Sequence, residues 1–73
     1  MELNILMDLC SDVAIRNFGG HLTIMRFTTG WKAWFGTPSF DPEEMRAGIA
    51  GLPSYPALEW ALRSLLINRS MLP

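Results

Sequence analysis

The chain has 73 residues, of which 49% are hydrophobic and only 18% charged, and its net charge is −1. This length predicts a single domain, residues 1–73, and Cys10 as the only cysteine excludes an internal disulfide. Because the charged fraction lies below the usual value of about 25%, some apolar groups must face solvent or a partner, which favours self-association.

The N-terminal residues do not have the pattern of a secretion signal. A basic first region is missing, and Glu2 and Asp8 interrupt the apolar stretch. No apolar run approaches the roughly 20 residues that span a bilayer. We therefore expect a cytoplasmic protein with no membrane partner.

Residues 2–17 are predicted to form the first helix. Apolar side chains recur there at three- and four-residue steps and form one stripe, made of Leu3, Leu6, Met7, Cys10, Val13 and Ala14. Gly19-Gly20 provides a stop, because glycine accepts the left-handed conformation that ends many helices. Cys10, among apolar neighbours, is expected to be a small buried residue.

Residues 21–27 and 31–35 are predicted to form a β-hairpin, since both are rich in β-branched and aromatic residues. A three-residue loop, Thr28-Thr29-Gly30, places Phe27 opposite Trp31. One face then carries Thr23, Met25, Phe27, Trp31, Ala33 and Phe35, and the other Leu22, Ile24, Arg26, Lys32 and Trp34. The alternative, a two-residue loop at Thr29-Gly30, shifts the pairing by one and regroups the faces.

Two further helices are predicted after the hairpin. Asp41 can cap a helix in which Pro42 takes the first position, and Gly48 and Gly51 limit this helix to one or two turns. The last helix runs from about residue 56 to 68, and its apolar stripe consists of Leu58, Ala61, Leu62, Leu65 and Leu66.

These elements predict an α+β fold: a small two-layer domain with an N-terminal helix, an antiparallel β-hairpin, a short helix and a C-terminal amphipathic helix. Both long helices are expected on one face of the hairpin, with Phe27, Trp31 and Phe35 in the core beneath them. Because a two-stranded sheet is marginal alone, we expect hairpin edges to pair across a two-fold axis.

No residues in the sequence form a recognisable catalytic set. His21 is the only histidine, and no spacing brings a nucleophile, a base and an orienting acid together. We therefore expect neither an enzyme nor a bound metal or cofactor.

The expected binding residues are Arg26, Lys32 and Trp34 on one hairpin face, and Trp60 and Ile67, which lie beside the core stripe of the last helix. The leading hypothesis is a small non-enzymatic interaction module, a homodimer that acts by binding another protein. The alternative is a nucleic-acid-binding regulator that uses the basic and aromatic hairpin face. The negative net charge makes nucleic acid the less favoured partner.

One pair of segments resembles a known family. "GWKAWF" followed by "AGLPSYPALEWALRSLL" is similar to the small HicB-type antitoxin domain, through Leu52, Pro53, Glu59, Ala61 and Leu62. The similarity covers under half of the chain, which lacks the family's first strand and its aspartate-rich linker and has an added N-terminal helix. The resemblance implies a hairpin-plus-helix packing module that binds a partner protein.

Overall fold

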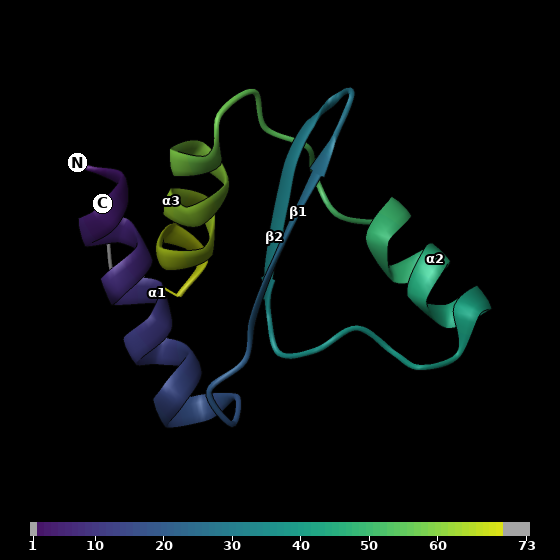
Figure 1. Cartoon of the computed structure of the whole chain (residues 1–73), viewed down its shortest axis with the longest axis horizontal. Coiled ribbons are helices and arrows are strands. Elements are labelled where there is room, and N and C mark those ends of the chain that lie inside the picture. The colour runs from purple at the N-terminus through teal and green to yellow at the C-terminus, as the bar shows by residue number, and fades with distance from the viewer. Residues whose placement is uncertain (1, 70–73) are drawn as a thin grey trace.

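The fold is α+β, with one hairpin between helices. The computed structural model describes residues 2–69, in the order α1 (Leu3–Asn17), β1 (Leu22–Phe27), β2 (Gly30–Phe35), α2 (Pro42–Ala50) and α3 (Leu58–Asn68). Helices α1 and α3 lie side by side on one side of the hairpin, and α2 lies on the other (Figure 1). The predicted fold and order of elements are confirmed.

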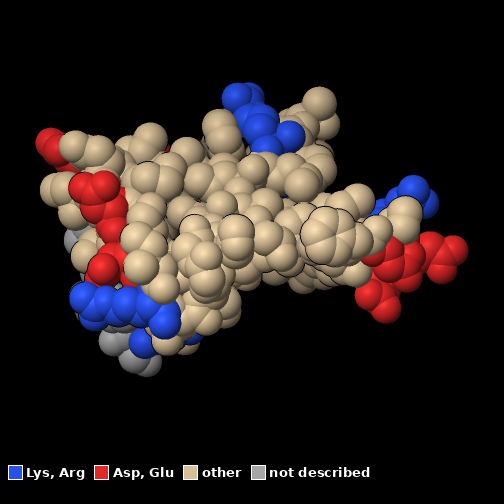
Figure 2. Space-filling model, turned by 60° about the horizontal axis from the view of Figure 1, so that its bottom comes forward, with Lys and Arg blue, Asp and Glu red and all other residues tan. Residues whose placement is uncertain are grey.

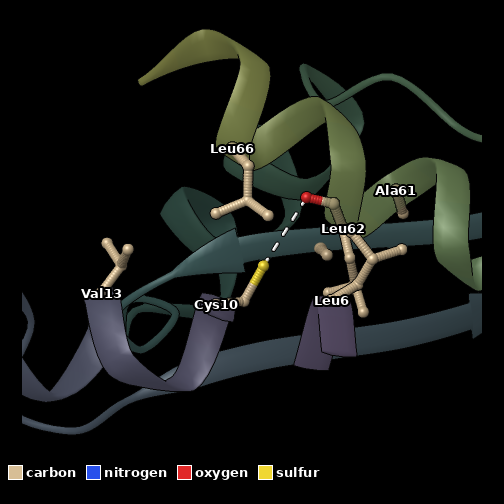
Figure 3. Close-up of a cluster of buried hydrophobic side chains, with 7 residues drawn as sticks. Leu6, Cys10, Val13, Ala61, Leu62 and Leu66 are labelled. Carbon is tan, nitrogen blue, oxygen red and sulfur yellow. Dashed lines mark hydrogen bonds between the residues drawn. The ribbon is translucent and has the colours of Figure 1, made fainter. Parts of the chain in front are cut away.

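The core lies where α1 and α3 meet each other and the hairpin. Its largest fully buried side chains are Leu6, Cys10, Leu62 and Leu66. The Cys10 thiol points toward α3 and donates a hydrogen bond to the Leu62 carbonyl oxygen, with 3.6 Å between sulfur and oxygen (Figure 3). Burial raises the pKa of the Cys10 thiol to about 11, because the thiolate would lose its hydration. The prediction of a buried Cys10 is confirmed.

The predicted register of the hairpin is wrong. Phe27 pairs with Gly30 and Arg26 with Trp31, so the loop consists of Thr28 and Thr29 only. The side chains are grouped on the two faces as in the alternative pairing, which shifts the register by one residue. That alternative placed its two-residue loop at Thr29-Gly30, however, whereas the observed loop is Thr28-Thr29. Leu22, Ile24, Trp31, Ala33 and Phe35 contact the core under α1 and α3.

This register changes the assignment of two predicted residues. Phe27 lies on the face away from the core, so its predicted core position is wrong, whereas Trp31 and Phe35 are confirmed there. In the predicted register Arg26 and Lys32 would be directly opposed, which is unfavourable for like charges. In the observed register Arg26 instead lies over the ring of Trp31, 5.1 Å from its centroid.

A short segment before α3 adds to the outer edge of β2. Trp31 and Tyr55 exchange two backbone hydrogen bonds, with N···O distances of 2.7 and 2.8 Å. Gly30 permits this approach: its φ is +138°, and a Cβ there would overlap the Tyr55 carbonyl oxygen. The hairpin is thereby tied to the connector that leads into α3.

The helices are short relative to a bilayer. Within residues 2–69, no helix combines the length and the apolar character needed to cross a membrane.

Candidate interaction surfaces

The outer edge of β1 presents unpaired backbone groups. Trp31 directs its backbone N–H and C=O to Tyr55, so the backbone of its partner Arg26 forms no hydrogen bonds with β2. Because hydrogen-bonded and non-hydrogen-bonded pairs alternate along an antiparallel ladder, the backbone groups of Ile24 and Leu22 also point away from β2. Among residues 2–69, no backbone or side-chain group bonds to the N–H or C=O of these three residues. We call Leu22, Ile24 and Arg26 the β1 edge.

A second surface lies between the hairpin and α2, on the face away from the core. It is a cleft of about 310 Å³ next to Trp34, bounded by residues 37–39, by α2 and by the residues that follow α2. Its apolar walls come from Trp34, Pro38, Met45, Ile49 and Leu52, and Glu44 also lines it. We call it the Trp34 cleft.

Among residues 2–69, a single hydrogen bond joins α2 to the hairpin, and α2 has no fully buried side chain. No residue of this nine-residue helix is buried, although isolated helices shorter than about 12–15 residues are marginal in water. Near the C-terminal end of α2, the Ile49 carbonyl oxygen accepts a hydrogen bond from the Lys32 ammonium, with an N···O distance of 2.7 Å. Near its start, Asp41 caps the helix as predicted, with its side chain accepting from the Glu43 N–H.

The start of α2 also departs from the expected pattern. A hydrophobic residue before the cap commonly packs against the fourth helical residue, which here would join Phe40 to Met45. Phe40 is instead 99% exposed and Met45 is 36% exposed. Glu44 does not reach the cap amide directly, because Ser39 stands between them: its hydroxyl donates to Glu44 and accepts from the Asp41 N–H.

The structure separates the predicted basic and aromatic site. Lys32 and Trp34 share the face that α2 covers, whereas Arg26 projects on the core side of the sheet. The Lys32 ammonium is engaged with Ile49 and lies 5.4 Å from the centroid of the Phe27 ring. The three residues therefore do not form one continuous patch.

The other two predicted residues lie on α3. Trp60 is 56% exposed and Ile67 is 42% exposed, so both lie outside the core as expected. The guanidinium of Arg63 lies 5.4 Å from the centroid of the Trp60 ring and covers part of it. Sequence reasoning did not single out Phe40, Met45 or Ile49. The spacing of Phe40 and Met45 about the Asp41 cap marks these two residues in the sequence, but only the structure shows that Phe40 stays exposed, and Ile49 has no such signal.

Within the part of the chain that the structure describes, no three His, Cys, Asp or Glu side chains gather where they would hold a metal ion. Comparison of the chain with protein-family models, curated proteins and solved structures gives no match. The resemblance to the HicB-type antitoxin domain therefore gains no support, and function has to be argued from the two surfaces.

Proposed function

We propose that this chain is a small non-enzymatic interaction module that forms a homodimer through the β1 edge and acts by binding another protein. The observation that supports it is the row of outward N–H and C=O groups on Leu22, Ile24 and Arg26. An unpaired edge of this kind is a template for another strand. The edge residues include no proline, and their only charged side chain is that of Arg26.

The β1 edge is complementary to itself. With a two-fold axis at Ile24, two copies pair antiparallel, Ile24 faces the partner's Ile24, and Arg26 faces the partner's Leu22. All the outward groups of the three residues then bond across the interface, and no like charges are opposed. The resulting sheet has the order β2-β1-β1-β2, in which the β1 edges of both copies are paired.

Backbone pairing alone gives a weak dimer. Each hydrogen bond contributes about 0.5–1.5 kcal/mol net, while association costs about 4–15 kcal/mol in lost translational and rotational freedom. Apolar side chains beside the edge must supply the rest. We therefore expect a monomer–dimer equilibrium in the micromolar range rather than a permanent dimer.

Two substitutions at Arg26 test the proposal. Arg26→Pro removes an outward N–H that β2 does not use, and proline is tolerated at such edge positions. Arg26→Val removes the same charge and the same contact with Trp31 but keeps the N–H. Sedimentation velocity should show dimers for the wild type and for Arg26→Val, and mainly monomers for Arg26→Pro, with similar far-UV circular dichroism.

Two results would contradict the proposal. One is a wild-type protein that stays monomeric at every accessible concentration. The other is an Arg26→Pro variant that dimerises as strongly as Arg26→Val, because the edge amide would then have no part in association.

A further inference from the structure

The Trp34 cleft has the size of a site for one side chain. Pockets for small molecules commonly run from about 300 to 1,000 Å³, so its 310 Å³ lies at the lower end. Its walls are apolar, and Trp34 supplies one aromatic face for stacking. A single large apolar or aromatic side chain matches both the volume and the lining.

The start of α2, beside the cleft, is acidic. Asp41, Glu43 and Glu44 are all exposed there, and Arg46 is the cation of the same helix. A second cation, the Lys32 ammonium, lies near the other end of α2, where it is bonded to the Ile49 carbonyl oxygen. Figure 2 shows acidic groups gathered at the α2 end of the molecule, with a basic group beside them; the surface between this end and the α1 end is mostly uncharged in this view, apart from a basic group at its upper edge. An incoming segment therefore gains from carrying positive charge.

The same charges argue against an exchange of Phe40 between two copies in this cleft. The chain's own exposed aromatic beside the cleft is Phe40, and it is followed directly by Asp41. Exchange of Phe40 between two copies would bring both sets of three carboxylates together, which is unfavourable. Phe40 is better placed to contact a cation of the incoming segment, since its whole face is open.

We propose that the Trp34 cleft binds an aromatic side chain of another protein, on a segment in which lysines or arginines flank that side chain. This inference rests on the proposed function and specifies the partner's chemistry. The aromatic ring enters between Trp34 and α2, while the flanking cations face Asp41, Glu43 and the open ring of Phe40. Binding adds the apolar packing that α2 lacks.

The test uses a fluorescein-labelled peptide, Gly-Lys-Lys-Trp-Lys-Lys-Gly, titrated with the full chain and followed by fluorescence anisotropy. Control peptides replace its tryptophan by alanine or its lysines by glutamates. The wild type should bind the first peptide with an affinity that falls as salt rises, and should bind each control at least about tenfold more weakly.

A matched pair of variants locates the binding. Gly48 lines the cleft, and apart from its own helix backbone and chain neighbours no atom lies within 4 Å of the position that a Cβ would take. Gly48→Leu therefore fills the cleft and improves helix propensity. Ala47→Leu adds the same side chain at an exposed position of α2 outside the cleft lining. Gly48→Leu should weaken peptide binding by about thirtyfold, and Ala47→Leu by less than about twofold.

Three outcomes would overturn the inference: no binding of the tryptophan peptide, equal binding by both variants, or a dimer fraction that Gly48→Leu lowers in the absence of peptide. The last would assign the cleft to a second copy. Sedimentation of the same samples reports separately on pairing at the β1 edge, so failure of the cleft and failure of the dimer are distinguishable.

Discussion

Replacing Gly30 by alanine tests the contact that joins the hairpin to the Tyr55 segment. The φ of +138° at Gly30 is strained for any other residue by about 1–3 kcal/mol, and the new Cβ would overlap the Tyr55 carbonyl oxygen and lie 2.7 Å from the Ser54 hydroxyl oxygen. Tyr55 must then move away and lose its two hydrogen bonds to Trp31, each contributing about 0.5–1.5 kcal/mol. The expected total is a loss of about 2–6 kcal/mol in the free energy of unfolding.

That loss is comparable to the whole stability of a domain of this size, about 3–5 kcal/mol. Urea unfolding followed by far-UV circular dichroism measures it. Gly20→Ala is the matched control, because Gly20 also has a positive φ, +85°, but has no atom within 4 Å of the added Cβ. Gly20→Ala should cost only about 1–2 kcal/mol. Equal urea midpoints for the two variants would refute the role given to the Tyr55 contact.

Two further predictions concern the core. Leu62→Ala should lower the free energy of unfolding by about 2–5 kcal/mol, because it leaves a cavity at a fully buried position; an unchanged urea midpoint would show that Leu62 is not in the core. For Cys10, burial raises the thiol pKa from 9.0 to about 11, so the folded state disfavours the thiolate. The contribution of the protonated thiol to stability is complete below the unfolded-state pKa and is lost as pH rises toward about 11. The urea midpoint of the wild type should therefore decline between pH 9.0 and 11, and Cys10→Ala should remove the part of this decline that comes from the thiol.

The long helices were predictable because their signals are local. In α1 the apolar stripe predicted the buried residues Leu6, Cys10, Val13 and Ala14. The helix ends at Asn17, just before Gly19-Gly20 as expected; both glycines have a positive φ, and the Gly20 N–H is bonded to the Ala14 carbonyl oxygen. In α3 the same periodicity predicted Ala61, Leu62 and Leu66. An apolar side chain every three or four residues identifies the buried face of a helix without any knowledge of the segments that pack against it.

The hairpin register was not predictable in this way, because both faces of the hairpin are apolar. Leu22, Ile24 and Phe35 look as suitable for a core as Met25, Phe27 and Trp34, so alternation does not choose between them. In the observed register Gly30 lies where a side chain would overlap Tyr55, a residue 25 positions away, so this contact has no local signal in the sequence.

The chain by itself therefore determined the fold class, the element order and the core faces of the two long helices, since each depends on neighbours within a few residues. Tertiary structure decided which hairpin face meets the core, that Arg26 lies apart from Lys32 and Trp34, and that α2 stands over a cleft beside a fully exposed Phe40. Those features depend on contacts between segments distant in sequence, and a short apolar hairpin with two similar faces carries no local pattern that encodes them.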